Sequence, residues 1–151
     1  MRRRLALAIA LVVCALSARG EPTEEEEDKL DPDYAGGRKA LEAKEWPGAI
    51  RLLGSAALRD TRNSDIQNLL GFAYRNSGDL AAAFRHYNRA LQLNPRHRGA
   101  HEYLGEAYLM IGNLAKAEEH LGALKKICLL PCAEYGILEG KVAAYRKRGA
   151  R

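Results

Sequence analysis

The sequence predicts an all-α protein built from stacked antiparallel helix pairs, and two observations predict this fold class. Residues recur with a period of 34 through the middle of the chain, as Gly37, Gly71 and Gly105 show, and a fixed period of this length indicates a repeat architecture. Within each period, apolar residues recur at the three- and four-residue spacing of an amphipathic helix. Turn residues interrupt each period at its middle and at its end, so each period is expected to form two helices.

The period at residues 64–97 shows the helix pair most clearly. The apolar face of its first half consists of Ile66, Leu69, Leu70, Ala73 and Tyr74. Gly78 ends this half, and Asp79 is a suitable N-cap for a second helix over residues 80–93. Pro95 then stops the second helix, because proline cannot continue the hydrogen-bond ladder.

This period resembles the tetratricopeptide repeat (TPR). The residues that carry the resemblance are Leu70, Gly71, Tyr74, Gly78, Ala83, Tyr87, Ala90 and Pro95. The third copy retains Leu104, Gly105, Tyr108, Gly112, Ala117 and Leu121, and the degenerate first copy retains Gly37, Ala40, Ala49, Leu53 and Ala56. The third copy departs from the family at Leu124 and Leu129, where the family prefers Ala and Pro. The resemblance implies a right-handed α-solenoid of three helix pairs, at about residues 30–63, 64–97 and 98–131.

A further helix is expected at residues 132–148, after the third repeat. Its apolar face consists of Tyr135, Leu138, Val142 and Tyr145. The last repeat of a solenoid has an uncovered apolar face, and a terminal helix with a polar outer side keeps it soluble. We therefore predict a capping helix that completes a TPR domain at residues 34–148.

Residues 1–20 have the order of a secretory signal peptide. Three arginines at residues 2–4 precede an apolar run at residues 5–13, and small residues follow. The run is shorter than the roughly 20 residues that span a bilayer. We expect export to the periplasm and cleavage before Glu21, or alternatively after Ala18. If the segment is not cleaved, it would be the chain's contact with the membrane.

The net charge of +5 comes mainly from that N-terminal segment. Without residues 1–20, the chain has 20 basic and 19 acidic residues, so the basic pI does not indicate a nucleic-acid partner. Residues 21–33 hold eight acidic residues and one basic residue, a composition typical of a disordered linker. The alternative is that this acidic segment folds over the basic domain and competes with an acidic partner.

Cys128 and Cys132 are the cysteines that remain beyond residues 1–20, and we expect them to form a disulfide between the third repeat and the capping helix. Unpaired thiols and a redox-active pair are the alternatives. The spacing is not Cys-x-x-Cys and no histidine lies nearby, so no metal site is expected. His97 and His101 are expected to form a surface pair.

The chain contains no phosphate-binding glycine loop and no nucleophile-elbow motif. We therefore expect no enzymatic activity, no cofactor and no small-molecule substrate. The TPR resemblance instead implies a concave groove, lined by the first helix of each pair, that holds a protein or peptide partner. The candidate groove residues are Arg38, Asn68, Phe72, Arg75, Asn76, Glu102, Glu106 and Met110.

Among these residues, Phe72 is expected to be an exposed apolar anchor and Arg75 to bind a peptide carboxylate or backbone. The alternative for Phe72 and Met110 is a place in the core. Tyr34 and Arg38 stand where some TPR proteins have the Lys and Asn that clamp a C-terminal carboxylate, so chaperone C-termini are not expected partners. The predicted function is an exported adaptor or assembly factor. An accessory redox component and a structural member of an envelope complex are the alternatives.

Overall fold

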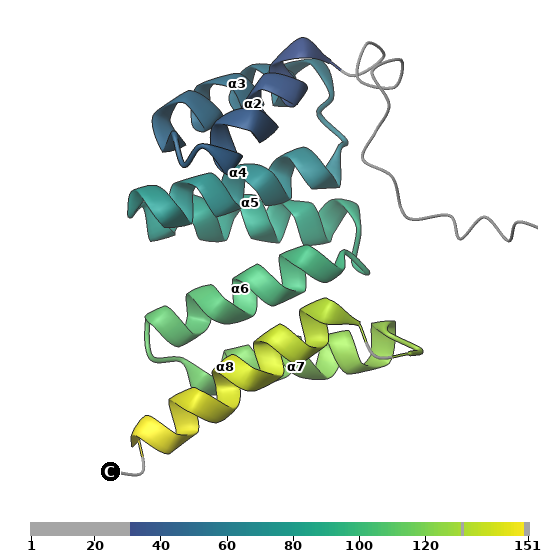
Figure 1. Cartoon of the computed structure of the whole chain (residues 1–151). Helices are drawn as coiled ribbons and strands as arrows, with labels where there is room; N and C mark the ends of the chain where they lie inside the picture. The colour runs from purple at the N-terminus through teal and green to yellow at the C-terminus, as the bar shows by residue number, and fades with distance from the viewer. Residues whose placement is uncertain (1–30, 131, 150–151) are drawn as a thin grey trace, which may run out of the picture.

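The computed structural model describes residues 31–130 and 132–149, and in this part of the chain it contains seven helices and no strand (Figure 1). The helices are α2 (Pro32–Glu42), α3 (Trp46–Arg59), α4 (Ser64–Ser77), α5 (Leu80–Leu93), α6 (Arg98–Met110), α7 (Leu114–Ile127) and α8 (Ala133–Gly149). Helices α2 to α7 form three antiparallel pairs stacked in chain order, and α8 packs on the last pair. The predicted all-α solenoid is confirmed. The signal segment and most of the acidic linker lie outside the described residues.

Side-chain caps set the helix starts at the same points of successive repeats. The Asn63 side chain accepts hydrogen bonds at the start of α4, and the His97 side chain does so at the start of α6. Asp79 and Asn113 cap α5 and α7 in the same way. Each pair of caps is 34 residues apart, so the period fixes where each helix begins.

The turn inside each pair requires one residue in the left-handed region of backbone space. Gly78 and Gly112 occupy it with φ of 94° and 78°. Lys44 occupies the equivalent position of the first repeat with φ of 59°. Glycine adopts this conformation without steric penalty, whereas a side chain is strained there.

Glycines allow the helices to cross closely, but the third repeat uses its glycine differently. A Cβ on Gly37 would lie 2.6 Å from Leu53, and one on Gly71 would lie 2.5 Å from the Tyr87 ring, so both glycines face the second helix of their own pair. A Cβ on Gly105 would instead lie 2.6 Å from Leu138 of α8. The capping helix thus packs directly against the first helix of the last pair.

The core follows the stack as three apolar clusters. One centres on Leu53 and Leu70, the next on Tyr87 and Leu104, and the last joins α7 to α8. In this last cluster Leu138 of α8 is fully buried. The described part of the chain contains no helix long and apolar enough to cross a membrane.

Helix α2 begins at Pro32, two residues before the predicted start of the TPR domain at residue 34. The Asp31 side chain accepts hydrogen bonds from the backbone N–H groups of Asp33 and Tyr34. Arg59 of α3 then pairs with Asp31 at 2.5 Å and with Asp33 at 2.6 Å. The Arg59 hydrogen bond lowers the pKa of Asp31 to about 2. The last acidic residues of the expected linker therefore form the first turn of the solenoid.

Candidate partner-binding groove

The first helices of successive pairs share one face, and this face contains two hollows. The N-terminal hollow has a volume of about 310 Å³ and lies across α2, α4 and α6. It is lined by Arg38, Leu41, Glu42, Leu69, Phe72 and Tyr103. Four of these six side chains are apolar or aromatic, so the hollow suits an apolar side chain.

The C-terminal hollow is larger, about 730 Å³, and lies across α4, α6 and α8. It is lined by Arg75, Asn76, Glu106, Leu109, Met110, Lys141, Ala144, Tyr145 and Arg148. Three of these residues are cationic and only Glu106 is acidic. This hollow therefore combines apolar walls with a net positive charge. Together the two hollows form the groove.

An aromatic cluster packs next to the N-terminal hollow, and Phe72 belongs to it. The Phe72 ring lies 5.1 Å from Tyr103 and 6.1 Å from Trp46, measured between ring centroids. The Arg75 guanidinium lies 5.4 Å from the Phe72 centroid and 5.1 Å from that of Tyr103. Phe72 is half-buried. The expectation of an exposed anchor is therefore wrong in part, because the rings of Trp46 and Tyr103 pack against Phe72 and cover part of it.

Arg75 is not a free groove cation, which corrects the expectation for this residue. Its Nη1 lies 2.5 Å from Oε2 of Glu106, and each of the two side chains is only 10% exposed. Lys141 of α8 pairs with the other oxygen of Glu106. The three groups tie α4, α6 and α8 together, so Arg75 has a structural role that spacing along one helix could not reveal.

The other predicted groove residues divide into exposed and buried groups. Met110 is 59% exposed and Asn76 is also exposed, and both line the C-terminal hollow. Asn68 and Glu102 are only 6% exposed and line neither hollow. They were expected at the groove surface and instead lie within the packed layer. Burial, followed by the nearby charge of Glu106, raises the pKa of Glu102 to about 7.

A polar contact recurs between the two helices of the second and third pairs, and sequence reasoning missed it. Nδ1 of His86 lies 2.9 Å from Oε1 of Gln67, and Nδ1 of His120 lies 2.9 Å from Nδ1 of His101. Both His86 and His120 stack on a tyrosine. The signal was present, because Gln67 and His101 are one period apart, as are His86 and His120.

The expected surface pair of His97 and His101 does not occur. His97 caps α6 and lies 2.9 Å from Asp65. Nε2 of His101 donates a hydrogen bond to the Pro95 carbonyl, at 3.0 Å. If both rings are neutral, Nδ1 of His101 must then accept a hydrogen bond from Nδ1 of His120. Burial, followed by the nearby His101, lowers the pKa of His120 to about 4, which favours that neutral state.

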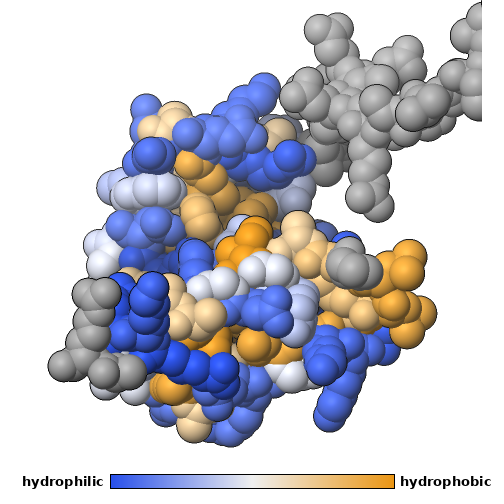
Figure 2. Space-filling model, turned by 60° about the horizontal axis from the view of Figure 1, so that its bottom comes forward, coloured by the Kyte–Doolittle hydropathy of each residue, from blue (hydrophilic) through white to orange (hydrophobic). Residues whose placement is uncertain are grey.

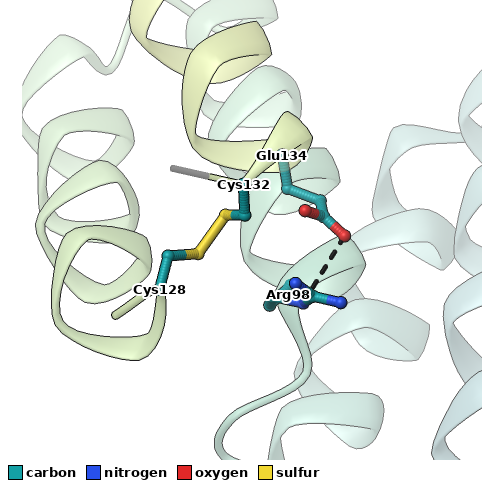
Figure 3. The surroundings of a disulfide bond; sticks show 4 residues. All are labelled: Arg98, Cys128, Cys132 and Glu134. Atoms are coloured by element: carbon teal, nitrogen blue, oxygen red, sulfur yellow. Dashed lines mark ion pairs between the residues drawn. A yellow bond between two sulfur atoms is a disulfide. The ribbon is translucent and has the colours of Figure 1, made fainter. Parts of the chain in front are cut away.

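Cys128 and Cys132 join the end of α7 to the start of α8. Their Sγ atoms are bonded at 2.06 Å, with the Cα atoms 5.9 Å apart (Figure 3). Beside this bridge, Arg98 of α6 and Glu134 of α8 form an ion pair at 3.6 Å. Among residues 31–130 and 132–149, no group of three histidine, cysteine, aspartate or glutamate side chains is placed to hold a metal ion.

Comparison with solved structures places this fold among TPR proteins. PcrH, solved in complex with the chaperone binding region of PopD, matches with a TM-score of 0.71 and 20% identity over 82% of this chain and 95% of that chain. SycD of Yersinia enterocolitica, a type III secretion translocator chaperone, has a TM-score of 0.71 and 15% identity over 87% and 90%. The first TPR of RPAP3, bound to an HSP90 peptide, has a TM-score of 0.69 and 18% identity over 79% and 91%. At these identities the likeness is one of fold.

Sequence comparisons support the same assignment. Uncharacterized protein ycf37 of Pyropia yezoensis is 31% identical over 101 residues, which are 60% of this chain and 57% of the relative. The match therefore spans little more than half of that relative's length. Two family models described as tetratricopeptide repeat match residues 34–95 and 74–127. The period, the helix pairs, the crossing glycines and these matches agree, and the chain belongs to the tetratricopeptide-repeat family.

Proposed function

We propose that this protein is an exported adaptor or assembly factor that binds a segment of a partner protein along the groove. The observation that carries the proposal is the pair of hollows on the face shared by α2, α4, α6 and α8. PcrH and SycD, which share the fold, have been solved with a region of PopD and with a peptide of YopD. A protein-interaction module is the function that this fold and these hollows support best.

The two hollows favour a partner segment of a particular chemistry. The N-terminal hollow offers Leu41, Leu69 and the aromatic rings to an apolar side chain. In the C-terminal hollow, Glu106 is already paired with Arg75 and Lys141, so Arg148 adds to a positive surplus. A segment that carries an apolar residue and an acidic residue complements the two hollows.

Two neighbouring residues provide a sharp test of this proposal. Met110 lines the C-terminal hollow and is 59% exposed, while Ile111 is 53% exposed and lines neither hollow. The partner would be captured from a periplasmic extract with the chain that begins at Glu21, and its affinity measured for each variant. Met110→Glu places a carboxylate among the apolar walls and should weaken binding at least about tenfold.

The matched control is Ile111→Glu, which adds the same charge one residue away and should leave the affinity within about twofold. Circular dichroism should show the same helicity for both variants. Equal affinities for Met110→Glu and Ile111→Glu would place the partner elsewhere and contradict the groove proposal.

Export is a separate part of the proposal and rests on residues 1–20 alone. Cell fractionation should place the protein in the periplasm, and N-terminal sequencing should find Glu21 or a residue close to it as the first residue. A periplasmic protein that still begins at Met1 would instead support an uncleaved anchor.

A further inference from the structure

The connection between α7 and α8 carries two adjacent leucines whose side chains are almost fully exposed. Leu129 is 93% exposed and Leu130 is 80% exposed. Together with Cys128 and Cys132 these residues form what we call the leucine loop. Figure 2 shows apolar side chains gathered at the right-hand edge of the molecule. Figure 1 places the connection between α7 and α8 at the same edge. Two adjacent leucines at the tip of a loop make a small apolar protrusion.

Cationic side chains surround the base of the leucine loop. Lys125 and Lys126, in the last turn of α7, are both exposed. Arg98 is half-exposed and forms an ion pair with Glu134. One acidic residue thus stands against three basic ones here, so the apolar tip rises from a positively charged base. A partner that covers the loop must be apolar in its interior and negatively charged at its surface.

The topology directs this loop to the edge at which the chain enters the solenoid. All first helices begin and all second helices end at one edge, because the pairs are antiparallel. Asp31 and the leucine loop therefore lie at the same edge (Figure 1). The sequence before Asp31 includes three arginines followed by an apolar run at residues 5–13, a composition that directs a chain to a membrane.

We propose that the leucine loop docks the solenoid on an anionic lipid surface. Leu129 and Leu130 enter the boundary between headgroups and acyl chains, and Lys125 and Lys126 contact the anionic headgroups. Both kinds of contact strengthen interfacial binding, one through buried apolar area and the other through charge. A lipid surface complements both features of the loop, because acyl chains suit the exposed leucine pair and anionic headgroups suit the lysines at its base. The short bridge from Cys128 to Cys132 limits the ordering entropy that docking costs.

The test is sedimentation of the chain that begins at Glu21 with lipid vesicles. This chain retains all the apolar clusters of the fold but lacks the apolar run at residues 5–13, which would bind lipid by itself. We expect it to pellet with phosphatidylcholine vesicles that contain about one third phosphatidylglycerol, and much less with phosphatidylcholine alone. Raising the salt concentration should weaken the binding.

Variants then separate the leucine loop from general surface effects. Replacing Leu129 and Leu130 by serine should reduce vesicle affinity at least about tenfold. The matched control is Leu58→Ser at the end of α3, because Leu58 is 82% exposed and lies outside the loop; its affinity should not change. Lys125→Ala with Lys126→Ala should reduce the preference for anionic vesicles by several-fold.

Three results would overturn the proposal. The first is absence of binding to anionic vesicles by the unsubstituted chain. The second is equal vesicle affinity for the double-serine variant and Leu58→Ser. The third is that replacing the two leucines abolishes binding of a protein partner and leaves vesicle binding unchanged, since this would identify the loop as a protein-docking site. Binding of a groove partner is measured separately with Met110→Glu, so the two proposals can fail independently.

Discussion

At the scale of single residues, Lys44 occupies a left-handed turn position for which glycine is the favoured residue. It has φ of 59° at the turn where the other two repeats have Gly78 and Gly112. A left-handed conformation costs a residue with a side chain about 1–2 kcal/mol, although glycine also increases the entropy of the unfolded chain. Lys44→Gly should therefore raise the free energy of unfolding by up to about 1 kcal/mol, measured by urea denaturation.

The preceding residue is the control for this prediction. Ala43 has φ of −75° in the right-handed region, so Ala43→Gly brings no relief of strain and should lower stability by about 0.5–1 kcal/mol. If both substitutions lower stability equally, Lys44 is not strained in the native turn.

Glu102 makes stability depend on pH. Its pKa is raised from 4.5 to about 7 by burial and by the charge of Glu106. Between these two pH values the folded chain holds a proton that the unfolded chain has released, so this group's contribution to stability falls as pH rises. Glu102→Gln should be nearly neutral at pH 4 and stabilising by up to about 3 kcal/mol above pH 7.

Thermal unfolding of wild type and Glu102→Gln across pH 4 to 8 measures this difference, and the contributions of the histidines cancel in it. Glu42→Gln, at an exposed site on α2, provides the control and should show no such trend. A difference between Glu102→Gln and wild type that does not change with pH would show that Glu102 is ionised throughout.

At the scale of helices, the close crossing of α4 and α5 depends on Gly71. A Cβ there would lie 2.5 Å from the Tyr87 ring, and Tyr87 is fully buried. Gly71→Ala should therefore force the two helices apart and lower the free energy of unfolding by about 1–3 kcal/mol. Denaturant unfolding followed by circular dichroism measures this change.

Gly54 in α3 offers a matched control, since an added Cβ there would meet no atom within 4 Å. Gly54→Ala should stabilise the helix by about 0.5–1 kcal/mol, because alanine loses less backbone entropy on folding. If Gly71→Ala stabilises the chain as Gly54→Ala does, the crossing is looser than the structure indicates.

The bridge between Cys128 and Cys132 links α7 to α8. It closes a loop of only a few residues, so the chain-entropy account gives at most about 2 kcal/mol. Replacing both cysteines by serine should lower the free energy of unfolding by that amount or less while the helices remain. A redox role would instead require the native pair to react readily with a mild reductant, which thiol labelling of the folded chain would reveal.

At the scale of the whole molecule, the period predicted the architecture well and the groove less well. The helix boundaries of α5 match the expectation because turn and cap residues are local signals: Asp79 starts the helix and Pro95 prevents its continuation. The environment of Arg75 could not be read in this way. Its partners Glu106 and Lys141 lie on α6 and α8, and helical spacing within α4 does not show which charges a neighbouring helix brings.

The half-buried histidines of the second helices show a related limit of sequence reasoning. His86 and His120 recur at the period, and this recurrence indicates a shared structural position. A histidine is polar, so the recurrence alone does not show whether its side chain is packed or exposed. Only the packing of α5 on α4, and of α7 on α6, shows that each imidazole finds a hydrogen-bond partner and a tyrosine to stack on.

The contact between Gly105 and Leu138 restricts how this protein can be lengthened by duplication of its 34-residue unit. Leu138 occupies the space beside α6 that Leu53 and Tyr87 occupy beside the first helices of the earlier pairs. A unit inserted between α7 and α8 would carry Leu138 away from Gly105, and the first helix of the inserted unit would have to refill that space. A copy of residues 64–97 inserted directly after that repeat would keep every existing crossing. Growth from the middle of the array therefore preserves the contact of α8 with α6, whereas growth at its C-terminal end must rebuild that contact.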